Sequence, residues 1–214
     1  MIFDLDGTLV NTLADLSDSM NHALASLGQP THPSSAIRTF IGDGVYTFAS
    51  RALGENSQHL VEEVVAAMRE HHRRNYLNKS SVYPGIFELI GELRKRGIRL
   101  AVLTNKDQTV AQQIVEHFFG SGVFEHVVGA VGKTPVKPDR KAVDGLLEKM
   151  GLKSADCRLV GDSGVDVDTA KAAGMRVAGV TWGFRDRAEL EGHGADVVVD
   201  SPAELLAEIE NQRG

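Results

Sequence analysis

Residues 1–9 read MIFDLDGTL, and the organisation of the rest of the chain follows from this segment. Its first three residues are apolar, which predicts a short strand buried on both faces of a parallel sheet. Asp4 and Asp6 come next, and the extended geometry of a strand places both carboxylates on one side, close enough to share a ligand. Gly7 can take the positive φ that lets the chain turn away from that ligand.

Two acids at the end of a buried strand are costly unless a metal or a phosphate-like group compensates their charge. An EF-hand loop does not fit, because counting from Asp4 places Thr8 and Leu9 where that loop needs an acidic ligand and a glycine. An ordinary acid pair at a strand-to-turn junction is also compatible with this segment alone.

Length and composition limit the classes of protein to which the chain can belong. With 214 residues the chain can form one large or two small domains, and no run approaches the ~18 apolar residues of a membrane span. Cys157 is the single cysteine, which excludes an internal disulfide and fits a reducing compartment. The net charge of −6 and the lack of a large basic cluster argue against nucleic acid. We therefore expect a cytoplasmic monomer or homodimer without signal peptide, membrane or nucleic-acid partner.

Residues 12–80 predict helices and no convincing strand. Apolar residues recur at spacings of three and four over 12–27, 45–53 and 58–76, and a short helix is expected over 34–40. The last helix ends in His71-His72-Arg73-Arg74, which we interpret as a solvated basic terminus that complements the helix dipole.

Beyond residue 84 the pattern alternates between helices and strands. Apolar runs predict strands over 98–103, 127–131, 158–160, 176–180 and 196–199, with helical periodicity between most of them. Such alternation implies right-handed βαβ units, hence an α/β fold with a doubly wound parallel sheet. We expect a Rossmann-like core of residues 1–11 and 81–214, with an all-helical cap, residues 12–80, inserted above the acids of the first strand.

Polar residues stand at the ends of four predicted strands or in the loops that follow them. Asp4 and Asp6 follow the first strand, and the others are Thr104, Asn105, Lys137, Asp162 and Asp166. Each alone has a structural explanation, such as a surface lysine or a helix N-cap. Because active groups of such sheets lie beyond the carboxyl ends of the strands, we expect them together, where they would suit a phosphate and a metal.

These motifs resemble, in order, those of the haloacid dehalogenase-like phosphohydrolases: FDLDGTLV at residues 3–10, a hydroxyl at Thr104, Lys137, and GDSGVD at residues 161–166. The resemblance covers nearly the whole chain. It implies that Asp4 is the nucleophile that forms an aspartyl-phosphate, and that Asp6 is the general acid and base. It also implies that the backbone carbonyl of Asp6 binds a metal and that Asp166 holds the metal directly or through another ligand.

The chemistry of a phosphate monoester accounts for these residue types. Its dianion repels an anionic nucleophile, and Mg²⁺ held by hard oxygen ligands removes that repulsion. We assign Asp4 and Asp162 as carboxylate ligands, Lys137 as a charge for the phosphoryl oxygens and Asp4, and Thr104 as a hydroxyl donor. Asn105, beside Thr104, is expected to contact the substrate.

The cap is expected to select the substrate. The segment that contains Gly42, Asp43, Gly44 and Arg51 is similar to the corresponding segment of phosphoglycolate phosphatases, which implies 2-phosphoglycolate as the substrate. The glycines would let backbone N–H groups approach a small molecule, and Arg51 could meet a carboxylate. A helix-connecting turn with a surface arginine is the alternative interpretation.

Four other functions use similar residues. A dehalogenase would not need an acid at Asp6, because halide departs without a proton. A phospho-accepting receiver domain is about half this length and lacks a helical insert. A phosphonate hydrolase would use a lysine in the cap, whose only lysine is Lys79 at its exit. A sugar-phosphate phosphatase or phosphosugar mutase of the same family remains open.

Overall fold

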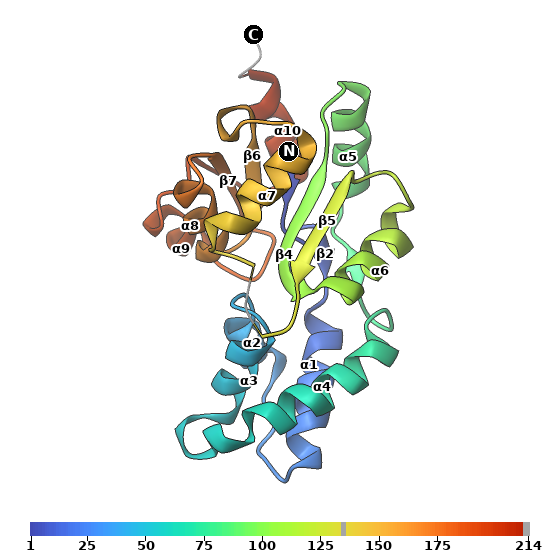
Figure 1. Cartoon of the computed structure of the whole chain (residues 1–214), viewed down its shortest axis with the longest axis vertical. Coiled ribbons are helices and arrows are strands. Elements are labelled where there is room, and N and C mark those ends of the chain that lie inside the picture. Colours follow the sequence, from blue (N-terminus) through green and yellow to red (C-terminus); the bar gives the residue numbers. More distant parts are fainter. Residues whose placement is uncertain (134–135, 212–214) are drawn as a thin grey trace.

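A computed structural model describes residues 1–133 and 136–211, and a six-stranded sheet forms its centre (Figure 1). The strand order is β5-β4-β1-β6-β7-β8, and all neighbours pair in parallel. The strands are β1 (Ile2–Phe3), β4 (Ala101–Asp107), β5 (His126–Ala130), β6 (Arg158–Gly161), β7 (Arg176–Val180) and β8 (Val197–Val199). The expected α/β fold with a doubly wound parallel sheet is confirmed.

Helices cover both faces of this sheet. One face carries α5 (Ile86–Lys95), α6 (Gln108–Phe119) and α10 (Pro202–Asn211), and the other carries α7 (Arg140–Met150), α8 (Gly164–Ala172) and α9 (Arg187–Gly192). A short 3₁₀ turn, η2 (Ser154–Asp156), precedes β6. Phe3 packs into the first layer and Ile2 into the second, both fully buried, which explains why β1 is apolar throughout.

A separate helical body is inserted between two short strands, and Figure 1 shows it in blue to teal below the sheet. It comprises α1 (Leu13–Ser26), α2 (Ser34–Phe40), α3 (Val45–Leu53), the 3₁₀ turn η1 (Glu55–Leu60) and α4 (Val61–Asn75). Its buried apolar side chains form a cluster of their own, which Phe184 of the core also joins. We call this body the cap.

The two connections between cap and core run side by side. Strand β2 (Val10–Asn11) pairs antiparallel with β3 (Ser81–Val82). Asp15, in the first turn of α1, is buried and accepts hydrogen bonds from the backbone N–H groups of Lys79 and Ser80 and from the Ser80 hydroxyl. The entry and exit of the cap are therefore tied together by a carboxylate, and sequence patterns gave no sign of this pairing.

Several element boundaries differ from those expected. Strand β4 extends to Asp107, because its polar end, residues 104–107, continues the extended chain that an apolar pattern cannot reveal. The long cap helix begins at Val61 rather than residue 58, since Ser57 has non-helical φ and ψ. Helix α9 was not predicted. No helix within residues 1–133 and 136–211 is long and apolar enough to cross a membrane.

Candidate active site

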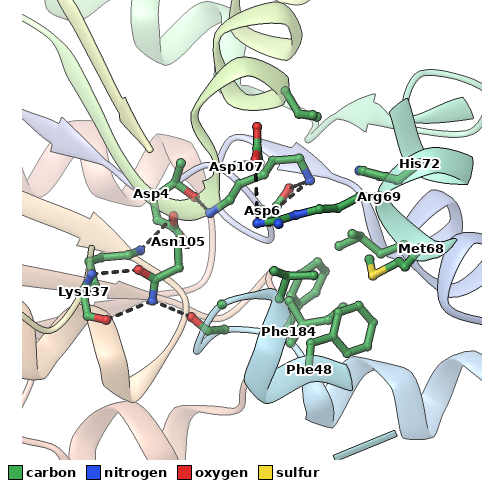
Figure 2. Close-up of a pocket in the computed structure, with 18 of the residues that line it drawn as sticks. Asp4, Asp6, Phe48, Met68, Arg69, His72, Asn105, Asp107, Lys137 and Phe184 are labelled. Atoms are coloured by element: carbon green, nitrogen blue, oxygen red, sulfur yellow. Dashed lines mark hydrogen bonds and ion pairs between the residues drawn. The ribbon is translucent and has the colours of Figure 1, made fainter. Parts of the chain in front are cut away.

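A cavity of about 550 Å³ lies between the carboxyl edge of the sheet and the cap, and residues of both line it (Figure 2). The core contributes Asp4 and Asp6 from the segment after β1, together with the polar end of β4, Lys137 and Asp162. The cap contributes an apolar wall that includes Phe48. The structure thus brings the strand-end residues singled out from the sequence, apart from Asp166, to the wall of a single cavity.

Three buried carboxylates form a compact cluster at the base of this cavity. Oxygen atoms of Asp4, Asp162 and Asp166 all lie within 4.8 Å of one another. The ammonium group of Lys137 lies 2.8 Å from Asp4 Oδ1 and donates a 2.6 Å hydrogen bond to Asp166 Oδ1. One lysine therefore pairs with two of the three acids, and the cluster carries excess negative charge when all three are ionised.

The carboxylates of Asp162 and Asp166 are each fixed by hydrogen bonds from neighbouring residues. Asp166 Oδ2 accepts from the backbone N–H and the hydroxyl of Ser163 at 3.1 and 2.7 Å, which forms the N-terminal capping box of α8. Asp162 Oδ1 accepts from the Thr8 hydroxyl at 3.0 Å, and its Oδ2 accepts from the backbone N–H of Phe184 at 2.6 Å. The carboxylates are held in place before any ligand binds.

Burial and mutual repulsion oppose ionisation of these acids. Burial, with the charge of Asp166, raises the pKa of Asp4 to about 6 although Lys137 acts against it. Burial, together with the charges of Asp4 and Asp166, raises the pKa of Asp162 to about 8. Burial alone would lower the pKa of Lys137, but Asp166 and Asp4 outweigh it and hold the pKa above its ordinary value.

The surroundings of the cluster fit a divalent metal ion. A Cβ on Gly7 would lie 2.3 Å from Asp162 Oδ2, one on Gly161 would lie 2.2 Å from Asp166 Cγ, and one on Gly183 would lie 2.3 Å from Asp162 Cβ. Such close approach of backbone to carboxylate requires glycine at these positions. Carboxylate oxygens without sulfur or imidazole ligands suit a hard cation, and its charge would offset the uncompensated acids.

Asp6 lies apart from this cluster in a different set of contacts. Its Oδ1 accepts a 2.7 Å hydrogen bond from the Thr12 hydroxyl, at the start of the cap. The ammonium group of Lys106, on β4, lies 3.1 Å from both carboxylate oxygens. Sequence reasoning missed Lys106, although the period of two along a strand places it on the same side as Thr104.

Thr104 and Asn105 have different surroundings. Thr104 is buried and its hydroxyl accepts a 3.3 Å hydrogen bond from the backbone N–H of Lys106. The side chain of Asn105 accepts from the backbone N–H of Lys137 at 2.7 Å and donates to its carbonyl at 3.0 Å. The same amide donates to the carbonyl of Gly42 in the cap at 2.9 Å. Asn105 therefore positions the Lys137 loop and joins it to the cap.

The cap residues expected to select the substrate separate into two groups. Gly42 and Gly44 line the main cavity. Asp43 and Arg51 form an ion pair at 2.6 Å and line a second crevice of about 390 Å³, outside the main cavity. The Arg51 guanidinium also donates to the carbonyl of Phe40. Arg51 thus pairs with a residue of the cap itself and does not face the acid cluster.

Helix α4 supplies polar cavity residues that sequence reasoning did not identify. Arg69 and His72 both line the cavity, together with Met68 (Figure 2). The interpretation of the helix end as a solvated basic terminus is wrong for His72, which is 7% exposed. Its place on the apolar stripe of the helix was the available signal, because that stripe faces inward.

Known proteins share the sequence and the fold of this chain. A family model described as haloacid dehalogenase-like hydrolase matches residues 1–180. The chain is 34% identical to a phosphoglycolate phosphatase of Haemophilus influenzae over 95% of both proteins. It is also 34% identical to one of Rhodospirillum rubrum, over 96% of this chain and 88% of that protein. The crystal structure of a predicted phosphoglycolate phosphatase from Haemophilus somnus superposes with a TM-score of 0.89 at 30% identity, covering 97% of this chain and 96% of the other.

Proposed function

The chain belongs to the haloacid dehalogenase-like hydrolases, and we propose that it is a Mg²⁺-dependent phosphatase whose preferred substrate is 2-phosphoglycolate. The observation that carries the proposal is the buried contact of Lys137 with Asp4 at the base of a cavity closed by the cap. A lysine that neutralises a buried nucleophilic carboxylate, and that can also face phosphoryl oxygens, suits attack on a phosphate dianion. Relatives named phosphoglycolate phosphatase that align along nearly the whole chain support the choice of substrate.

Asp4 and Asp162 would hold the Mg²⁺ ion, with the backbone carbonyl of Asp6 and with Asp166 either in contact with the ion or supporting the other ligands. When bound, the ion supplies positive charge that reduces the repulsion between the carboxylate nucleophile and the phosphate dianion. Asp166 also contacts Lys137, so it orients the lysine as well as the ion.

Asp4 attacks phosphorus and forms an acyl phosphate, while the bond from phosphorus to the ester oxygen breaks. Asp6 acts as the general acid and gives a proton to the departing alkoxide. The Asp6 carboxylate then takes a proton from a water molecule, whose oxygen attacks phosphorus. Asp4 is released and inorganic phosphate forms, which returns both acids to their starting states. Thr12 and Lys106 hold the Asp6 side chain for these proton transfers.

Thr104 and Lys137 bind the phosphoryl oxygens in this proposal, and Asn105 keeps the Lys137 loop in place. The hydrogen bond from Asn105 to Gly42 joins this part of the core to the cap. Closure of the cap excludes water other than the attacking molecule. We place the activity in the cytoplasm, where the buried thiol of Cys157 stays reduced.

A sugar-phosphate phosphatase or mutase is the second candidate, and one observation favours it. A cavity of about 550 Å³ is generous for a substrate as small as phosphoglycolate. Hydrolysis of a hexose phosphate, or its conversion to an isomer, would therefore be compatible with the available space.

A substrate panel tests the proposal. Phosphoglycolate, hexose phosphates including glucose 1-phosphate, nucleotides and pyrophosphate are compared by kcat/KM, with Mg²⁺ and with a chelator in its place. We expect phosphoglycolate to lead and the chelator to abolish turnover. Activity that survives removal of divalent cations would contradict the metal dependence, and a leading hexose phosphate would replace the proposed substrate.

A further inference from the structure

We propose that Arg69 of α4 is the residue that recognises the carboxylate of the substrate, across the cavity from the acid cluster. The inference rests on the proposed function, because it concerns the end of phosphoglycolate that is remote from the reacting phosphorus. It assigns selectivity to a residue outside the 42–51 segment singled out from the sequence.

The guanidinium group of Arg69 spans the gap between cap and core, and its buried Nε is not used in a hydrogen bond. Its Nη2 donates to the carbonyl of Gly132 at 3.1 Å. The same atom lies 3.9 Å from Asp107 Oδ2 (Figure 2). Its Cζ lies 5.6 Å from the centre of the Tyr46 ring, which supports the planar group from one side. Its Nε is buried and has no hydrogen-bond partner. A buried N–H without a partner is costly, so this atom is suited to a ligand.

The other cationic residues that line the cavity within the described residues have carboxylate or carbonyl partners. Lys137 contacts Asp4 and Asp166, and Lys106 contacts Asp6. Arg73 pairs with Glu70 at 2.6 Å. Arg185 donates to backbone carbonyls of the cap at Arg38, Thr39 and Ile41. Arg69 also has a carbonyl and a carboxylate neighbour, and it differs from these residues in the buried Nε that has no hydrogen-bond partner.

His72, one turn further along α4, does not compete for an anion. The Ser19 hydroxyl donates to the carbonyl of Asp15 at 2.7 Å, so its oxygen accepts from His72 Nδ1 at 3.2 Å. This leaves His72 Nε2, buried and without a partner, as an acceptor. Burial, with the nearby charge of Lys106, lowers the pKa of His72 to about 2, so the ring is neutral. A neutral acceptor cannot bind a carboxylate, whereas Arg69 beside it can.

A carboxylate bound to Arg69 would lie where α4 meets the loop at Gly132, with Lys106 on the core side of the same cavity. Binding would then add contacts between cap and core, and the closed state would be favoured by substrates that carry the acid group. A charged hydrogen bond of this kind is worth about 1.5–3 kcal/mol, which corresponds to roughly 10–150-fold in kcat/KM.

The test uses two substrates of nearly equal size, 2-phosphoglycolate and 2-hydroxyethyl phosphate, which differ in the carboxylate. The ratio of their kcat/KM values is measured for the wild type, Arg69→Met and Lys133→Met. Lys133 is the matched control, because it neighbours Gly132 and forms an ion pair between the core and Glu62 of the same helix, with both partners outside the cavity. Arg69→Gln is measured in parallel, so that the comparison stands if the methionine variant does not fold.

We expect Arg69→Met and Arg69→Gln to lower the ratio by about 10–150-fold, mainly through KM for phosphoglycolate, and Lys133→Met to leave it within about threefold. Equal losses on both substrates in the Arg69 variants would overturn the inference, as would the same selective loss in Lys133→Met. The result of this test can be distinguished from the result of the substrate panel that tests the proposed function. If a hexose phosphate leads the substrate panel, the proposed substrate fails, while the ratio still reports whether Arg69 recognises the carboxylate.

Discussion

Asp162 is surrounded by groups that fix its carboxylate and by charges that resist its ionisation. It is 2% exposed and accepts hydrogen bonds from Thr8 and Phe184, which favour the charged form. Burial and the charges of Asp4 and Asp166 act in the opposite direction and raise its pKa to about 8. The residue is therefore destabilising when ionised without a metal and suited to binding one.

The raised pKa of Asp162 determines whether the protein becomes more or less stable as pH rises. Between the ordinary pKa of an aspartate, about 4, and a folded-state pKa of about 8, the folded protein holds a proton that the unfolded chain has lost. The free energy of unfolding of the metal-free protein should therefore decrease as pH rises through this range. Asp4, with its pKa raised to about 6, acts in the same direction over the lower part of the range.

Asp162→Asn should stabilise the metal-free protein at pH 8, because it removes a charge that the folded state disfavours. We expect the Tm to rise by at least about 3 °C, since 1 kcal/mol shifts the Tm of a domain this size by about 2–4 °C. The gain should shrink at pH 5, and added Mg²⁺ should raise the Tm of the wild type but not of the variant. Calorimetry at both pH values, with chelator and with Mg²⁺, measures these differences. A variant less stable than the wild type at pH 8 would contradict the electrostatic account.

At the scale of elements, the cap is held against the core by two arginines that point in opposite directions. Arg38 of α2 donates from Nε and Nη2 to the carbonyls of Phe184 and Gly183, each at 2.6 Å. Arg185 of the core donates from Nη1 to the carbonyl of Arg38 at 2.7 Å. The backbone N–H of Phe184 also donates to Asp162, so these contacts of the two arginines are linked to the acid cluster through Phe184.

Arg38→Ala should favour the open arrangement of the cap. We expect faster hydrogen exchange in β2 and β3, where cap and core are connected, and a KM raised by similar factors for all substrates, because closure serves each of them. Arg74→Ala is the control, since Arg74 pairs with Glu70 within α4 and is exposed. If hydrogen exchange in β2 and β3 is no faster in Arg38→Ala than in the control, the Arg38 contacts do not hold the cap closed.

At the scale of the whole molecule, the sheet and its acids could be predicted because their signals are local. Buried parallel strands leave continuous apolar runs, and the polar residue that follows each run lies at the same edge of the sheet. Asp4, Asp162 and Lys137 were found in this way, without knowledge of the packing. Thr104 and Asn105 were also expected at the end of β4. The continuation of this strand to Asp107 and the role of Lys106 were missed, because an apolar pattern carries no information about a polar segment.

The contacts between cap and core could not be predicted, because they depend on how two bodies dock. The periodicity of α4 indicates which face packs inside the cap, but not that Arg69 reaches Gly132 of the core. Nor does any pattern show that Lys106 pairs with Asp6, or that Arg51 pairs with Asp43 instead of facing the cavity. The role of Arg51 in substrate binding stays a prediction, and the structure adds that Arg51 pairs with Asp43 beside a second crevice.

Trapping the covalent intermediate tests most directly whether Asp4 is the nucleophile of a phosphatase. The Asp6→Asn variant is mixed with Mg²⁺ and an aryl phosphate labelled at phosphorus, quenched in acid and digested, and the labelled peptide is identified. An aryl oxygen leaves with little protonation, so Asp4 should still be phosphorylated, whereas loss of the Asp6 base should slow hydrolysis and let the intermediate accumulate. We expect the label on Asp4, and none when Asp4→Asn is added. Label on another residue, or steady phosphate release without any labelled protein, would contradict the assignment.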